Sequence, residues 1–408
     1  MSLDMILSNV RLLGREELVD LGVQNGRIAA IAPFLNAEAP RWDGGGALAF
    51  PGFVDSHVHL DKACILDRCA ICEGTLTEAI QQTAAAKAKF TVEDVYARAK
   101  RVLEKAILQG TNRMRTFVEV DPRAGFRSLE AITALRADYS HAIDLEICAF
   151  AQEGLTQEMD TFAMLDASLN LGATLVGGCP YADPDPGQHI SLIFELARKH
   201  DVDVDFHLDF DLDPSGSAIP AVLRATETYG YGGRVSIGHV SKLSAMVPED
   251  VQNIARHMSD AGVALSVLPA TDLFLMGRDR TKLVPRGMAP ADVLRKQGVV
   301  TSVATNNVLN PFTPFGDASL SRMANMFSNV AQLSRDSDLE AAFAMVTSDA
   351  ARLMRVPDYG IEIGGVADVV LIDGPDAASA VREIAPVLAG WKAGKQTFER
   401  PRARLIKP

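Results

Sequence analysis

Histidines at the ends of apolar segments are the residues of this sequence best suited to chemistry. Four of the eight histidines have this placement: His57, His59, His207 and His239. His57 and His59 alternate along an extended stretch, so both imidazoles face one side and can bind one cation at about 2.0–2.1 Å. Taken singly, His207 and His239 could also be core residues bonded to backbone carbonyls. We expect the other four histidines to be surface or packing residues: His141, His189, His200 and His257.

Eight short apolar or alternating segments recur through the middle of the chain, with amphipathic helical patterns such as 92–106 and 190–198 between them. This alternation predicts a (β/α)8 barrel, and a doubly wound sheet is the second candidate. In such a barrel, active sites are assembled at the carboxyl ends of the strands, which is where the four histidines fall. The predicted strands are residues 53–57, 116–120, 145–150, 174–178, 202–207, 235–239, 263–268 and 299–304.

Both ends of the chain have strand character. Asn25-Gly26 separates the alternating segments 18–23 and 27–31, which is typical of a type I′ β-hairpin. Strand-like segments return near the C-terminus at 365–372 and 387–391.

These patterns predict two domains. We expect residues 1–50 and 355–408 to fold together as a small β-sandwich. Residues 51–354 would form the barrel beside it.

Composition narrows the class of partner. The 408 residues carry a formal net charge of −12, which repels nucleic-acid backbones and anionic membrane surfaces. No apolar segment approaches the roughly 18 residues needed to span a bilayer. We therefore expect a cytoplasmic protein with a small-molecule substrate and no nucleic-acid or membrane partner, and a homo-oligomer is compatible with the sequence. Five cysteines, an odd number, do not make a disulfide framework.

Several segments together resemble the cytosine deaminase branch of the amidohydrolase superfamily, which also contains N-isopropylammelide amidohydrolase. The likeness spans nearly the whole chain and implies a (β/α)8 barrel that carries out metal-dependent hydrolysis. The segments are 51–62 (PGFVDSHVHLDK), 150–154 (FAQEG), 207–209 (HLD), 238–239 (GH) and 310–316 (NPFTPFG).

The resemblance implies a role for each matching residue. His57, His59 and His207 would bind one divalent metal ion, zinc or iron. His239 would hydrogen-bond the metal-bound water or the oxyanion that forms from it. Gln152 would contact the ring amide of a substrate.

Two positions depart from the family's pattern. Asn306 stands where the family carries an aspartate that binds the metal and takes the water's proton. Phe210 stands where it carries a glutamate that moves this proton to the ring nitrogen. Asn306 can still offer a carbonyl oxygen to a metal, but it is no general base, and Phe210 cannot carry a proton. Each loss is expected to remove about 10²–10⁴-fold of rate in the family's reaction.

Asp209 and Asp211 are candidates to replace the missing acid–base groups. Along an extended segment they share a face with His207, and family members also carry aspartate at the position of Asp209. The alternative is that these aspartates cap the next helix or lie in solvent.

Three functions are compatible with the sequence. The first is a metal-dependent hydrolase acting on a C–N bond of a cyclic or heterocyclic amine, with altered acid–base groups. The second is a catalytically silent small-molecule-binding protein on the same scaffold. The third is a different hydrolysis, such as opening of a ring amide or cleavage of a C–halogen or C–O bond. In the hydrolase, the residues lining the substrate would be Gln152, Phe210, Asn307 and Phe312.

Overall fold

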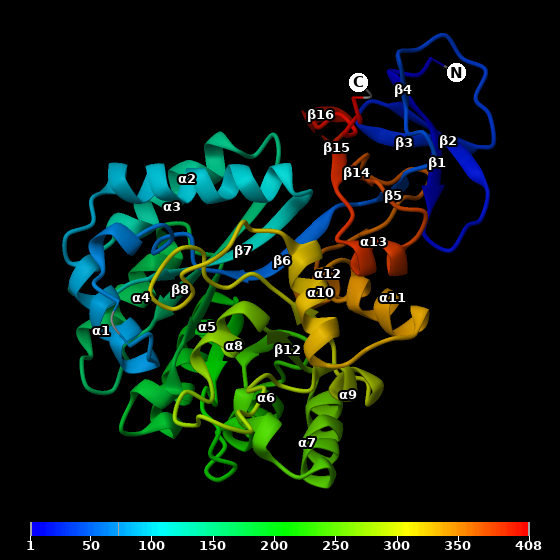
Figure 1. The fold of residues 1–408 in the computed structure, drawn as a ribbon. Helices are drawn as coiled ribbons and strands as arrows, with labels where there is room; N and C mark the ends of the chain where they lie inside the picture. The colour runs from blue at the N-terminus through cyan, green and yellow to red at the C-terminus, as the bar shows by residue number, and fades with distance from the viewer. Residues whose placement is uncertain (1, 72, 407–408) are drawn as a thin grey trace.

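Eight parallel strands form the centre of the structure, a computed structural model that describes residues 2–71 and 73–406 (Figure 1). Each strand pairs with the next along the chain. Past β13, Asn306 forms a parallel bridge with Val58 of β6, so the two ends of the sheet meet and the predicted (β/α)8 barrel is confirmed. The strands are β6 (Phe53–Val58), β7 (Thr111–Glu119), β8 (Asp144–Ala151), β9 (Leu175–Gly178), β10 (Asp203–Leu208), β11 (Val235–His239), β12 (Val263–Val267) and β13 (Thr301–Val303).

Helices surround the barrel because each buries one apolar face against it. In α2, for example, Val95, Val102 and Leu103 are fully buried, and the Thr91 hydroxyl accepts a hydrogen bond from the backbone N of Asp94 at the helix start. The helices are α1 (Leu76–Lys87), α2 (Val92–Leu108), α3 (Arg127–Asp138), α4 (Asp160–Asn170), α5 (Pro186–His200), α6 (Ile219–Tyr229), α7 (Pro248–Ala261), α8 (Pro269–Leu275), α9 (Ala291–Lys296), α10 (Leu320–Val330), α11 (Asp336–Ala344), α12 (Ser348–Leu353) and α13 (Ala377–Glu383).

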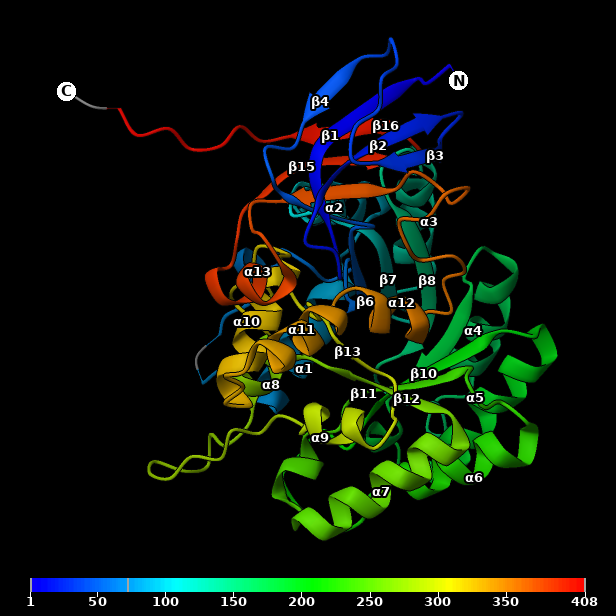
Figure 2. The ribbon, with the colours of Figure 1, turned by 90° about the vertical axis from the view of Figure 1, so that its right-hand side faces the viewer.

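A second, mainly antiparallel sheet contains strands from both ends of the chain and lies beside the barrel (Figure 2). Its order is β16-β15-β14-β5-β1-β2-β3, with β4 paired to β1, so β5 joins the N-terminal strands to the C-terminal ones. The predicted hairpin is confirmed, since Asn25 and Gly26 both have positive φ, as a type I′ turn requires. The strands are β1 (Met5–Leu12), β2 (Leu18–Gln24), β3 (Arg27–Ala32), β4 (Arg41–Asp43), β5 (Leu48–Phe50), β14 (Val369–Ile372), β15 (Val387–Lys392) and β16 (Lys395–Glu399).

None of the helices in the described part of the chain has both the length and the apolar character that crossing a membrane requires.

Candidate metal centre and substrate pocket

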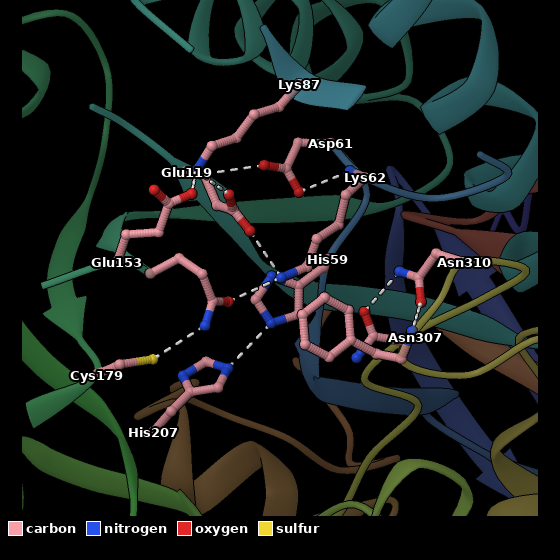
Figure 3. Close-up of polar contacts among 12 residues, drawn as sticks. His59, Asp61, Lys62, Lys87, Glu119, Glu153, Cys179, His207, Asn307 and Asn310 are labelled. Atoms are coloured by element: carbon pink, nitrogen blue, oxygen red, sulfur yellow. Dashed lines mark hydrogen bonds and ion pairs between the residues drawn. The ribbon is translucent and has the colours of Figure 1, made fainter. Parts of the chain in front are cut away.

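Three imidazoles converge inside the carboxyl end of the barrel. His57 lies in β6, His59 directly follows that strand, and His207 lies in β10. The Nε2 atom of His207 lies 2.9 Å from Nε2 of His57 and 3.0 Å from Nε2 of His59 (Figure 3 shows the second contact). All three side chains are buried. The spacing brings three nitrogen donors to one point, where they can hold a metal ion.

Burial keeps these imidazoles neutral. It lowers the pKa of His57, His59 and His207 well below the ordinary value, and nearby positive charges, including Lys62, lower each pKa further. Neutral imidazole is the form that binds metal ions. The donor set therefore fits a divalent cation in its protonation as well as in its placement.

Asn306 lies beside these histidines with its carboxamide unsatisfied. Its backbone N donates to the carbonyl of His57 (2.8 Å), and its own carbonyl accepts from the backbone N of His59 (2.8 Å). Its φ of 60° is left-handed, a conformation that asparagine tolerates better than most residues. Within residues 2–71 and 73–406, neither Oδ1 nor Nδ2 of Asn306 has a hydrogen-bond partner, although both are buried. Leaving buried amide atoms unpaired is costly, so this side chain also fits a bound ion or ligand.

His239, at the end of β11, is paired with a carboxylate that the sequence did not reveal. Its Nδ1 lies 2.7 Å from Oδ1 of Asp272, in α8. A carboxylate can only accept a hydrogen bond, so this contact favours a proton on Nδ1. The ring of Phe210 covers one face of His239, with centroids 3.9 Å apart. The one sequence signal for Asp272 is its position in the first turn after a barrel strand.

Lys62, which sequence reasoning missed, and Gln152, which it predicted, form a second polar group at the site. Lys62 Nζ donates to Oε1 of Glu119 (2.7 Å) and to Oε1 of Gln152 (2.9 Å), and it lies 4.5 Å from the centre of the Phe312 ring. Gln152 Nε2 in turn donates to the sulfur of Cys179 (3.3 Å). These two contacts fix the orientation of the predicted substrate-contacting amide. Lys62 lay inside the quoted motif, but nothing in the sequence showed which way it points.

Behind Lys62, a second ammonium is enclosed by carboxylates. Lys87, the last residue of α1, donates to Oε2 of Glu119 (2.9 Å) and to Asp121 (2.6 Å). It also contacts Glu153, and Figure 3 shows Lys87 beside Glu119 and Glu153. Burial alone would raise the pKa of Glu119, but the two ammonium groups outweigh it and lower that pKa to about 2. Glu119 is therefore an anion that bridges two lysines.

Asp209 and Asp211, the predicted acid–base substitutes, have other partners. Asp209 accepts from Ser217 Oγ (2.6 Å) and from the backbone N of Ala218 (3.0 Å), directly before α6. Asp211 pairs with Lys242 (2.7 Å), and half of its side chain is exposed. These contacts match the alternative interpretation, in which the two aspartates serve a helix start and the surface.

The remaining predicted pocket residues are Asn307, in the loop after β13, and Phe210 and Phe312, in an apolar cluster. Asn307 Oδ1 accepts from Asn310 Nδ2 (2.7 Å), and Asn310 Oδ1 accepts from the backbone N of Phe312 (3.0 Å). An apolar cluster, which we call the apolar cap, contains Phe312 together with residues of α1, of α8 and of the segment after β10. Its buried members are Ala79, Phe210, Leu275 and Phe312.

Comparison with known proteins agrees with this geometry. The sequence model of the amidohydrolase family matches residues 145–398, and the chain belongs to this family. Membership places it among hydrolases of carbon–nitrogen bonds outside peptides.

Individual relatives extend the likeness over the whole chain. N-isopropylammelide isopropyl amidohydrolase of Pseudomonas sp. (strain ADP) is 27% identical over 96% of this chain and 96% of its own length. Pterin deaminase of Rhizobium rhizogenes is 28% identical over 86% of this chain and 81% of its own. The crystal structure of 5-methylcytosine deaminase from Klebsiella pneumoniae with 5-fluorocytosine superimposes with a TM-score of 0.94 at 27% identity, covering 99% of this chain and 100% of that one.

Proposed function

We propose that this chain is a metal-dependent hydrolase that cleaves a C–N bond of a cyclic or heterocyclic amine with acid–base groups unlike those of its family. The observation that carries the proposal is the convergence of three neutral imidazole nitrogens beside the His239–Asp272 pair. The similarity to proteins named for N-isopropylammelide, pterin and 5-methylcytosine supports a nitrogen heterocycle as the substrate class.

The metal site would be formed by side chains from three strand ends. His57, His59 and His207 would hold zinc or iron, and Oδ1 of Asn306 would provide an oxygen donor. Bound there, the ion supplies Lewis acidity and makes water acidic enough to attack at neutral pH. Asn306 is neutral, so it would compensate less of the ion's charge than an aspartate would, and the metal would be held less tightly.

Proton transfer falls to His239. Its Nδ1–H is fixed on Asp272, so Nε2 is free to take a proton from the attacking water and later return it to the leaving amine. Asp272 stabilises the imidazolium formed in between, as the carboxylate does in other Asp–His pairs. Gln152 would orient the ring through its amide, while Phe210, Asn307 and Phe312 would form the other walls.

A catalytically silent binding protein is the second candidate, and one observation favours it. Phe210 stacks on His239 and belongs to the apolar cap, so the position where the family places a proton carrier is occupied by a packed ring. In that case the pocket would bind a heterocycle without converting it.

Metal analysis and product release together test the proposal. The purified protein is expected to hold one divalent ion per chain and to release ammonia or an alkylamine from at least one compound in a panel of aminopyrimidines, aminotriazines and pterins. His59→Ala should lose the ion and the activity, whereas His141→Ala, in an exposed histidine, should keep both. A protein that binds no metal overturns the proposal. A metal-loaded protein that binds panel members without product release, even in single-turnover experiments, supports the silent alternative.

A further inference from the structure

Lys62 is a buried ammonium on the wall of the proposed substrate pocket. The residue is 2% exposed, and its charge is felt by His59, His57 and His207, whose pKa values it helps to lower. Burying a charge is expensive unless it is paired and hydrogen-bonded, so a lysine at this place calls for a physical reason.

The contacts of Lys62 pair it on one side only. Glu119 supplies its counter-charge at 2.7 Å, from the side that leads to Lys87. Toward the pocket, its neighbours are the neutral carboxamide of Gln152 and the ring of Phe312. An ammonium has three N–H donors, and in the described part of the chain two of them are hydrogen-bonded. One donor is left to a ligand.

Lys87 holds the side chain of Glu119 in place. Each carboxylate oxygen of Glu119 accepts a hydrogen bond from a different lysine, so the two lysines hold Glu119 in one orientation. Lys87 is itself compensated by Asp121 and contacts Glu153, so its charge is balanced away from the pocket. The chain of ion pairs from Lys87 through Glu119 thus holds Lys62 in one place.

Among the described residues, the buried acids nearest Lys62 already have partners: Glu119 pairs with both lysines, and Asp61 accepts from the backbone N of Lys62 and of Glu119. Asn306 and Phe210 are neutral at the two positions where the family's pattern has carboxylates, and Asp272 is bound to His239. A bound divalent ion would add to the positive charge of Lys62. A negatively charged ligand would accept a charge-assisted hydrogen bond from the remaining N–H of Lys62.

We propose that Lys62 determines substrate specificity by selecting a heterocycle that carries negative charge, as a ring oxyanion, a deprotonated imide or a carboxylate, and that Lys87 positions it through Glu119. This inference rests on the proposed function, because it takes the pocket beside the three histidines as the substrate site. It names the substrate class within that function: an anionic ring instead of a neutral one.

Calorimetric titration of the metal-free and zinc-loaded protein with two ring probes tests the inference. Barbiturate is an anion at neutral pH and uracil is a neutral ring of similar shape. We expect barbiturate to bind about tenfold more tightly or better, since a charge-assisted hydrogen bond is stronger than a neutral one. In Lys62→Met the preference should disappear through weaker binding of barbiturate, with uracil little changed. Lys87→Met should reduce the preference, and Lys87→Arg should restore it.

Lys242→Met is the matched control. Lys242 is also a buried lysine paired with a carboxylate, but its partner is Asp211, outside the proposed pocket. This variant should keep the full preference. If Lys62→Met does not fold, the comparison of the two probes on the unaltered protein still decides the matter.

Each other outcome has a definite meaning. Equal affinity for the two probes, no binding of either, or a preference that persists in Lys62→Met overturns the inference. Metal-dependent hydrolysis of neutral heterocycles without a charge preference would overturn it while leaving the proposed function standing. A preference for the anion with no hydrolysis of any compound would instead overturn the catalytic function and support the binding-protein alternative.

Discussion

At the scale of residues, the site combines three histidines that could hold a metal ion with few groups that could carry a proton. Three neutral imidazoles converge within hydrogen-bonding distance, and a carboxamide beside them has no partner among the described residues. The groups that could move protons are reduced to His239 with Asp272. The chemistry of this chain should therefore respond most strongly to changes at three positions: Asn306, Phe210 and Asp272.

Restoring the two acidic groups should raise deaminase activity. In the double variant Asn306→Asp, Phe210→Glu, the aspartate would add a base and the glutamate a proton carrier, each worth about 10²–10⁴-fold in such reactions. We expect ammonia release from aminopyrimidines to increase at least about 10²-fold when steady-state rates are compared at equal metal content. Asn253→Asp, outside the site, should leave the rate unchanged. If the double variant folds and binds metal without any gain, the assignment of these two positions is wrong.

Removing the carboxylate behind His239 should slow turnover without loss of metal. In Asp272→Asn the amide can present its NH₂ to Nδ1 and favour the wrong tautomer of His239, so the rate should fall by about 10²-fold or more. Metal content per chain and the melting temperature separate this effect from damage to the site. A variant with unchanged kcat would show that His239 does not depend on Asp272.

At the scale of elements, the bounds of a strand were predictable where the strand contains no charged residues. β11 has both faces buried and contains no charged residue, and it matches its predicted bounds. β7 begins five residues before the prediction, at Thr111, because its first half contains Arg113 and Arg115, which mask the apolar pattern. Arg115 is buried and paired with Glu146 and with Asp205 of β10. The burial of these charges could not be predicted from the sequence, because their ion-pair partners lie on other strands.

The same reason limits prediction of the site. Strand-end placement found the histidines, since the position of a strand end is a local property of the sequence. The pairs His239–Asp272 and Lys62–Glu119 join residues 33 and 57 positions apart, and no periodicity links them. Sequence reasoning therefore found the three histidines that converge and missed Asp272, Lys62 and Glu119, which pair with residues distant in the sequence.

The loops after β8 and β9 are joined by a buried carboxylate, which gives a prediction for pH. Asp183 accepts from the backbone N of Leu155 (2.7 Å) and of Thr156 (2.9 Å), and from Nδ1 of His189 (2.5 Å) in α5. Burial raises the pKa of Asp183, but the hydrogen bonds outweigh this and lower it to about 2. Since the pKa in the folded state lies below that of the unfolded chain, Asp183 stabilises the fold above about pH 4, and this contribution is lost as the pH falls toward 2.

Urea unfolding at several pH values measures this contribution. Asp183→Asn should lower the free energy of unfolding by about 2 kcal/mol at neutral pH, and the difference from the unaltered protein should shrink as the pH falls below about 4. Asp279→Asn, in an aspartate that is 78% exposed, should change neither value. A difference that stays constant down to about pH 2 would mean that the carboxylate charge contributes nothing.

At the scale of the whole molecule, the small sheet and the barrel share part of their interior. Val370 of β14 and Val387 of β15 belong to the same hydrophobic core as the barrel residues, and both pack against Gly110 at the start of β7. Asp368, before β14, pairs with Arg113 of β7 at 2.9 Å. Apolar contacts and ion pairs therefore link the two units, although the small sheet also has a buried apolar cluster of its own, which includes Leu21, Val369 and Trp391.

This shared interior predicts that the two units unfold together, and the tryptophans allow the test. The chain has two tryptophans, Trp42 in β4 and Trp391 in β15, whose rings pack edge to face with centroids 5.3 Å apart. Tryptophan fluorescence therefore reports on the small sheet, whereas far-ultraviolet circular dichroism reports mainly on the helices around the barrel. Denaturant midpoints from the two signals should coincide, as two-state unfolding requires. Val387→Ala should shift both midpoints together and lower the free energy of unfolding by about 1–3 kcal/mol. A shift of the fluorescence midpoint alone would show that the sheet unfolds independently of the barrel.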